Sequence, residues 1–213
     1  MYTELELVNH ILHTLGESIT PTLETQHPAV LSARSVLTSV NKEFQGDGWW
    51  FNKVFNVKLL PDSDGRVRIP AETLMFKVTR CVMDMQMPGR KQRFVKRGEF
   101  LWDNHLQTDN IGTAVWADYV ELIAIEDLPT NAGTYLKHYA AERAFIDDDG
   151  DLNQHTELKR RSAMAYSKLK SDELKSIQAN ALESPFAMKL LYGPRGGATQ
   201  RGLFLGGGRP YES

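Results

Sequence analysis

The spacing of apolar residues changes twice along this chain, and this pattern constrains the fold more than any other feature. Apolar residues recur every three or four positions up to Gln45, alternate with polar residues over much of 54–125, and return to helical spacing after Pro129. Helical spacing predicts amphipathic helices, and alternation predicts half-buried strands. From Ser184 onward the chain is rich in glycine and basic residues. We therefore predict an α+β fold: a four-helix bundle frame, an inserted small antiparallel β lobe and an extended C-terminal tail.

The same pattern predicts the domain organisation. Residues 1–50 and 126–183 are expected to form a discontinuous helical domain, residues 51–125 an inserted β domain, and residues 184–213 a flexible arm. With 213 residues, the chain is long enough for one substantial core, or for one core plus a smaller lobe.

Composition excludes several classes of protein. The net charge of −2 argues against a protein that binds nucleic acid over its whole surface. Cys81 is the only cysteine, so no intrachain disulfide is predicted. The first residues lack the basic and then apolar layout of a signal peptide, and no apolar run approaches the length of a membrane span. We therefore expect assembly in a cytoplasm and no membrane partner.

The first helix has a clear start and stop. Thr3 and Glu6 have the spacing of a capping box, and Gly16 can supply the left-handed stop. Its apolar stripe consists of Leu5, Val8, Leu12 and Leu15. The opposite face carries Glu6, His10, His13 and Glu17, which we interpret as a solvent face because their spacing matches no recognised metal site.

A second helix is predicted to begin near His27, because Pro28 suits the first helical position. Gly46 and Gly48 are expected to end it. Three adjacent aromatic residues follow, namely Trp49, Trp50 and Phe51. Such rings can stack nucleic-acid bases, but at a helix-to-strand junction they are more typical of a core. We interpret them as the hinge core between the frame and the lobe.

The lobe is predicted to begin with a hairpin. Alternating residues at 54–59 and 66–69 flank a turn rich in aspartate, proline and glycine. Four further strands are expected, at 75–85, 93–96, 99–102 and 115–125.

Two more helices are predicted after Pro129. Thr130 or Asn131 can cap the first, and the second is expected to run from Gln154 to Ala181. The second helix has a broad, mildly apolar surface, which is typical of a helix with two neighbours, one of which can be another subunit. The candidate residues of this subunit interface are Leu158, Ala165, Leu169, Leu174 and Ile177.

The C-terminal tail combines glycine and proline with apolar and basic side chains. Glycine and proline make regular structure unfavourable, whereas a solvated linker has no need of apolar residues. One interpretation is an arm that orders on an acidic or grooved partner, and the other is a tail folded back onto its own subunit. The candidate contact residues are Phe186, Leu190, Tyr192, Arg195, Arg201, Phe204, Arg209 and Tyr211.

No motif predicts a cofactor, a metal site or a catalytic residue. The chain has neither a phosphate-binding glycine loop nor a glycine-flanked nucleophilic serine. Residues 149–153 match the start of a calcium loop, but Gln154 and Arg160 stand where glycine and glutamate are needed. The neighbouring aspartates could supply the two carboxyl groups of a glycoside hydrolase, although consecutive aspartates usually share one solvated environment. These are Asp147, Asp148, Asp149 and Asp151.

Several stretches, in order along the chain, resemble the tail tubular protein A family of short-tailed bacteriophages (podoviruses), the head-to-tail adaptors also called gatekeeper proteins. Relatives tend to have tyrosine at the position of Trp102. The stretches are LVNHIL at 7–12 with LGE at 15–17, GWWFN at 48–52, LLPD at 59–62, VKRGEFLWD at 95–103, DLP at 127–129 and AAERAF at 140–145.

The resemblance implies a structural virion protein without enzymatic activity or a cofactor. Members form a ring, usually of twelve copies, between the portal protein and the tail nozzle, which is tail tubular protein B. Genomic DNA passes through the ring without sequence-specific binding, and a mildly acidic chain agrees with such a conduit. The helices are expected to form the ring wall, the β lobe to project outward or toward the next tail component, and the C-terminal arm to contact the portal. The isolated protein need not be a ring.

Two other functions remain open. The first is a tail-associated hydrolase that acts on host surface polysaccharide through the aspartates of 147–151. The second is a free-standing nucleic-acid-binding module, which would bind DNA in a salt-sensitive way.

Overall fold

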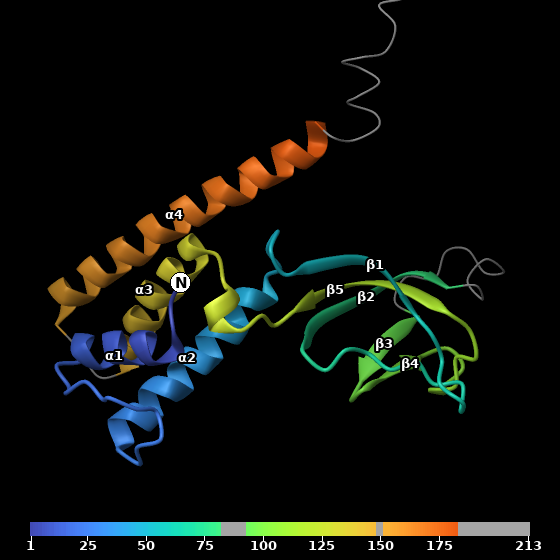
Figure 1. Ribbon diagram of the computed structural model, residues 1–213, viewed down its shortest axis with the longest axis horizontal. Coiled ribbons are helices and arrows are strands. Elements are labelled where there is room, and N and C mark those ends of the chain that lie inside the picture. The colour runs from blue at the N-terminus through green and yellow to red at the C-terminus, as the bar shows by residue number, and fades with distance from the viewer. Residues whose placement is uncertain (82–92, 148–150, 183–213) are drawn as a thin grey trace, which may run out of the picture. The chain divides into compact units, whose positions relative to one another are not determined.

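A computed structural model describes residues 1–81, 93–147 and 151–182. In these residues, four α-helices and small antiparallel sheets form an α+β fold, as the sequence predicts (Figure 1). Two helices precede the strands and two follow them. Residues Met1–Leu174 form one compact unit.

Helix α1 (Glu4–Thr14) begins with the predicted capping box. The backbone N–H of Glu6 donates to Thr3 Oγ1 at 3.2 Å, and the backbone N–H of Thr3 donates to Glu6 Oε2 at 2.9 Å. Gly16 adopts a φ of +77°, and the N–H of Glu17 donates to the carbonyl of Leu12. Both predicted ends of this helix are therefore confirmed.

Helices α2 (Pro28–Gly46) and α3 (Thr130–Asp147) pack against α1 and against each other. Pro28 occupies the start of α2, as predicted. Helix α4 (Leu152–Leu182) begins two residues before the predicted start and buries Leu169 in the same core. The core of these helices includes Leu7, Ile11, Ala33, Leu37, Phe44, Trp49, Ala132, Leu136, Ala140 and Leu169.

The strands form two sheets. Strands β1 (Lys53–Leu59), β5 (Val115–Glu121) and β2 (Thr73–Cys81) make a three-stranded sheet with β5 in the centre, and both pairings are antiparallel. Strands β3 (Phe94–Arg97) and β4 (Phe100–Asp103) make an antiparallel pair. The apolar core of the lobe is separate from that of the helices and consists of Val67, Ile69, Cys81, Leu101, Ile111 and Val115.

The predicted hairpin between 54–59 and 66–69 is wrong. Strand β1 pairs with β5, and a single bridge joins Pro61, which lies beyond the end of β1, to Val67. The turn between them does form, since the N–H of Asp62 donates to the carbonyl of Arg66 at 2.8 Å. Alternation shows which face of a strand is buried, but it does not specify which strand lies beside it. Within the segment 66–69, Arg68 instead forms a single bridge to Phe100 of β4, and Arg66 forms one to Asn110, which precedes β5.

Two other strand boundaries differ from the prediction. The last strand ends at Glu121 rather than at residue 125, and Ile125–Asp127 forms a short 3-10 helix, η2. Strand β2 begins at Thr73 and is described up to Cys81, while the predicted continuation through 82–85 lies outside the described residues.

Candidate assembly surfaces

The aromatic residues that follow α2 lie at the junction of the helices and the lobe. Trp49 is 1% exposed, and its indole Nε1 donates to the carbonyl of Phe44 at 2.8 Å. Its ring stacks on that of Phe51, with centroids 6.5 Å apart. Trp50 and Phe51 are half-buried against the same core. The structure therefore places these rings among core residues, with Trp49 closed to base stacking, while their role as a hinge stays a prediction.

Asn52 is a buried amide at this junction that the sequence analysis did not single out. Its Oδ1 accepts the backbone N–H of Trp49 at 2.7 Å. Its Nδ2 donates to the carbonyls of Gln45 and Glu121, each at 3.0 Å. One side chain thus joins the end of α2 to the end of β5. The sequence signal that could have identified Asn52 is its position directly after the three adjacent aromatic residues.

Gln45 makes a second connection across the same junction. It is fully buried, its Nε2 donates to the carbonyl of Ile123 at 2.8 Å, and its Oε1 accepts the backbone N–H of Ile123 at 2.8 Å. Asn41 Oδ1 accepts a further bond from Gln45 Nε2. Side-chain amides are stable inside a protein when their donors and acceptors form hydrogen bonds. Gln45 and Asn52, which we call the junction amides, therefore fix where the lobe strands meet the helices.

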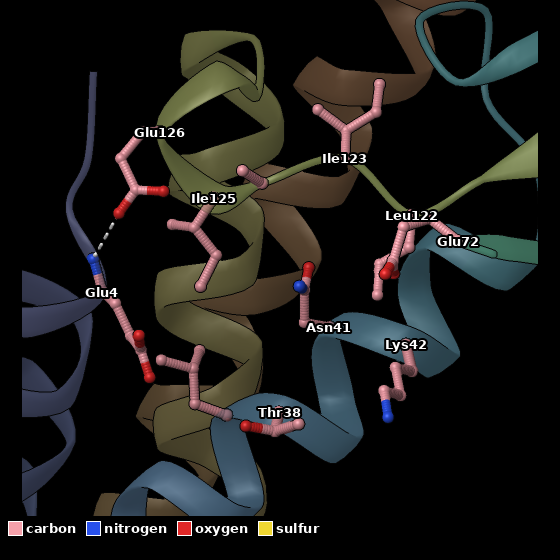
Figure 2. A pocket seen from close by; sticks show the side chains of 11 residues that line it. Glu4, Thr38, Asn41, Lys42, Glu72, Leu122, Ile123, Ile125 and Glu126 are labelled. Atoms are coloured by element: carbon pink, nitrogen blue, oxygen red, sulfur yellow. Dashed lines mark hydrogen bonds between the residues drawn. The ribbon is translucent and has the colours of Figure 1, made fainter.

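A groove of about 400 Å³ is lined by Asn41 and Ile123, both of which bond to Gln45 (Figure 2). Its walls come from the start of α1, from α2, from Glu72 and from the segment 122–126. The Glu126 carboxylate accepts the backbone N–H of Glu4 at 3.3 Å, as Figure 2 shows. The Glu4 carboxylate in turn pairs with Arg34 at 2.7 Å. Two carboxylates of the groove are thus engaged in contacts that tie α1 to α2 and to η2.

The outer face of the three-stranded sheet exposes apolar side chains. Phe55 on β1 is 68% exposed and Met75 on β2 is 57% exposed. Both line a shallow hollow of about 160 Å³ that also involves Lys53, Lys77 and residues of β5. Exposed apolar side chains that line one hollow together mark a candidate contact surface.

Inside the lobe, Arg93 and Asp103 form a buried ion pair. Arg93 Nη2 lies 2.6 Å from Asp103 Oδ2, and Asp103 Oδ1 accepts the backbone N–H of His105 at 2.8 Å. Burial raises the pKa of Asp103, but the hydrogen bonds from Arg93 and from the backbone N–H groups of His105 and Leu106 outweigh it, so the pKa lies below its usual value. The pair fixes the end of β4 and the following turn.

Two histidines meet between α1 and α3. The rings of His10 and His138 lie edge to face, with centroids 5.7 Å apart. Burial lowers the pKa of His10 to about 4, and the nearby charges of Lys137, His138, His13 and Arg161 add to this effect. In the part of the chain that the structure describes, no three histidine, cysteine or carboxylate side chains are arranged to hold a metal ion.

The candidate interface residues of α4 fall into two groups. Leu158, Ala165 and Leu169 are buried against their own chain, whereas Leu174 and Ile177 are 58% and 53% exposed. Further contacts fix α4 in place: the Ser162 hydroxyl donates to the buried Glu142 carboxylate, and the Lys170 ammonium lies 4.3 Å from the Trp49 ring centroid. Only the exposed group is available to a neighbouring subunit.

The candidate arm residues and part of the acidic loop belong to stretches that the structure does not describe. Phe186, Leu190, Tyr192, Arg195, Arg201, Phe204, Arg209 and Tyr211 lie outside the described residues, as do Asp148 and Asp149. Asp151 is exposed, and its Oδ1 accepts the backbone N–H of Asn153 at 3.1 Å at the start of α4. Asp151 therefore has a helix-capping role.

Among the described residues, no helix combines the length and the apolar character that crossing a membrane requires.

Comparison with known proteins identifies the family. The sequence profile of the tail tubular protein family matches residues 5–184, which include α1 from its second residue onward, the other three helices and all five described strands. The chain is also 24% identical over 187 residues to tail tubular protein A of Klebsiella phage KP34, an alignment that covers 88% of this chain and 95% of that protein. The chain therefore belongs to the tail tubular protein family and is a structural component of a bacteriophage tail.

Proposed function

We propose that this protein is a head-to-tail adaptor. Copies of the chain form a ring, dodecameric in the complete particle, between the portal protein and the tail nozzle, and genomic DNA passes through the lumen. The four helices act as one bundle that makes the ring wall, and the lobe projects from it. Residues 184–213 form an arm that contacts the portal.

The observation that carries this proposal is the family match over 5–184. The match includes both the helices and the lobe, so we infer that both take part in contacts within the phage tail. The exposed side chains of Leu174 and Ile177 support a subunit contact along α4. The net charge of −2 supports a conduit, since a lumen without excess cations does not grip the DNA phosphates.

Electron microscopy of the protein mixed with its portal tests the proposal directly. We expect a ring of adaptor subunits on one face of the portal, with the symmetry read from class averages. A portal that remains bare at micromolar adaptor concentrations would contradict an adaptor function.

The arm is tested by deleting residues 184–213. We expect the shortened chain to keep its circular dichroism spectrum and to bind the portal more weakly. A shortened chain that binds the portal as tightly as the full chain would contradict the arm while leaving the ring intact.

A further inference from the structure

The outer face of the three-stranded sheet combines exposed apolar side chains with positive charge. Phe55 and Met75 come from β1 and β2, which lie on opposite sides of β5. In the register of the sheet, Met75 stands opposite Val120, and Val120 also stands opposite Lys53. The two apolar side chains therefore flank the same part of β5, and the hollow of about 160 Å³ lies there.

The charges around this hollow are mostly positive. Lys53 and Lys77 line it, and Lys58 and Arg80 lie farther along the same strands, over the ring of Trp116 at 5.6 and 4.8 Å from its centroid. The carboxylate that lines the hollow belongs to Asp118, and its Oδ1 accepts the backbone N–H of Asn56 at 2.8 Å. We call the surface formed by Lys53, Phe55, Met75, Lys77 and Asp118 the lobe face.

We propose that the lobe face is the docking site for an acidic surface of another tail protein, which inserts an apolar side chain between Phe55 and Met75. In the adaptor, this partner is the tail component on the side away from the portal. The inference rests on the proposed adaptor function for the position of the partner, and on the lobe face for its chemistry. Opposite charges would fix the register, and the apolar contact would supply most of the affinity.

Two other occupants satisfy the lobe face less well. Duplex DNA would pair its phosphates with the lysines, but its bases are stacked inside the helix, so Phe55 and Met75 would stay exposed to water. A second copy of the chain, paired through the same face about a two-fold axis, would place lysine opposite lysine. An acidic protein surface with an apolar side chain satisfies both the charges and the apolar hollow.

The test uses full-length variants of the lobe face with purified portal and nozzle proteins. One variant is Phe55→Ser and the other is Lys53→Glu combined with Lys77→Glu. Each has a matched control: Leu60→Ser removes a side chain that is 65% exposed just beyond β1, and Lys77→Arg keeps the charge. All four side chains project from the surface, so thermal unfolding is expected to match the wild type and to verify folding.

We expect Phe55→Ser and the double glutamate variant to bind the nozzle about tenfold more weakly than the wild type, and both controls to bind within about twofold. Wild-type binding should also weaken as the salt concentration rises. All variants should assemble with the portal as the wild type does. Nozzle binding therefore tests the lobe face, and portal assembly tests the adaptor function. The adaptor function would be contradicted only if the wild type did not bind the portal.

Three results would overturn the inference. The first is nozzle binding that is equal in the wild type and in both lobe-face variants. The second is single- or double-stranded DNA binding, measured by fluorescence anisotropy, that the lobe-face variants lose while nozzle binding persists. The third is a concentration-dependent dimer of the isolated protein that Phe55→Ser abolishes without an effect on the nozzle.

Discussion

At the scale of single residues, Asn52 connects two neighbouring backbone groups, those of Gln45 and Trp49, to the distant carbonyl of Glu121. Replacing it by alanine leaves the N–H of Trp49 and the carbonyls of Gln45 and Glu121 without their partner in a buried place. We expect Asn52→Ala to lower the free energy of unfolding by about 2–3 kcal/mol. Urea unfolding followed by circular dichroism measures it.

The matched control is Asn104→Ala, which changes the same residue type at an exposed turn position and should alter stability by less than about 0.5 kcal/mol. Equal effects of the two substitutions would show that the Asn52 hydrogen bonds contribute nothing beyond those of a surface amide.

His10 makes stability depend on pH. In the unfolded chain its imidazole takes up a proton as the pH falls below 6.5, whereas in the folded chain it does so only near pH 4. The unfolded state therefore binds more protons between these values, and the free energy of unfolding decreases as the pH falls from 6.5 to about 4. The ring is only partly buried, so solvent screening limits the effect to on the order of 1 kcal/mol.

His10→Gln should remove this part of the pH dependence, measured as unfolding free energy at several pH values. His138 also has a lowered pKa, chiefly because of burial, so a smaller slope of the same sign should remain. The matched control for the substitution itself is His27→Gln, which changes an exposed histidine at the start of α2. If the His10→Gln variant kept the wild-type slope, His10 would not be a source of the pH dependence.

At the scale of elements, α4 offers two leucines in opposite environments. Leu169 is fully buried and Leu174 is 58% exposed. Leu169→Ala should cost about 2–5 kcal/mol, because it removes apolar contacts and leaves a cavity where α4 meets the other helices. Leu174→Ala should change the stability of the subunit by less than about 0.5 kcal/mol. Thermal unfolding of the isolated protein measures both.

Under the proposed function, Leu174 has a second role that Leu169 lacks. Leu174→Ala should weaken ring formation on the portal while leaving the isolated protein stable, and electron microscopy of the mixture would show incomplete rings. Intact rings with this variant would move the proposed subunit contact away from this part of α4.

At the scale of the whole molecule, the helices and the lobe have separate cores joined by the junction amides. Cys81 is the only cysteine and is fully buried in the lobe core, so its reaction with a thiol reagent reports opening of the lobe. Circular dichroism at 222 nm reports mainly the helices. We expect both signals to change at the same urea concentration in the wild type.

Gln45→Ala removes the hydrogen bonds to Ile123, and it should separate the two transitions so that Cys81 reacts at lower urea than the helices unfold. The Asn104→Ala variant should keep the transitions coincident. Coincident transitions in Gln45→Ala would show that the two cores are coupled by other contacts.

The candidate assembly surfaces were only partly predictable from the sequence. The aromatic residues of the junction were singled out because they are adjacent in the chain, and Trp49 does lie in a core. The junction amides and the lobe face were not singled out. Gln45 and Asn52 act on backbone groups as far as 78 and 69 residues away. Phe55 and Met75 line the same hollow only because β1 and β2 both pair with β5.

The helices could be predicted from the sequence, since capping and apolar spacing act between residues a few positions apart. Thr3 with Glu6, Gly16 and Pro28 mark ends that the structure confirms. The pairing of the strands and the covered side of α4 depend instead on contacts between distant parts of the chain. Alternation tells which side chains face inward, but β1 pairs with β5 across the whole lobe, and a strand's neighbour depends on contacts distant in the chain.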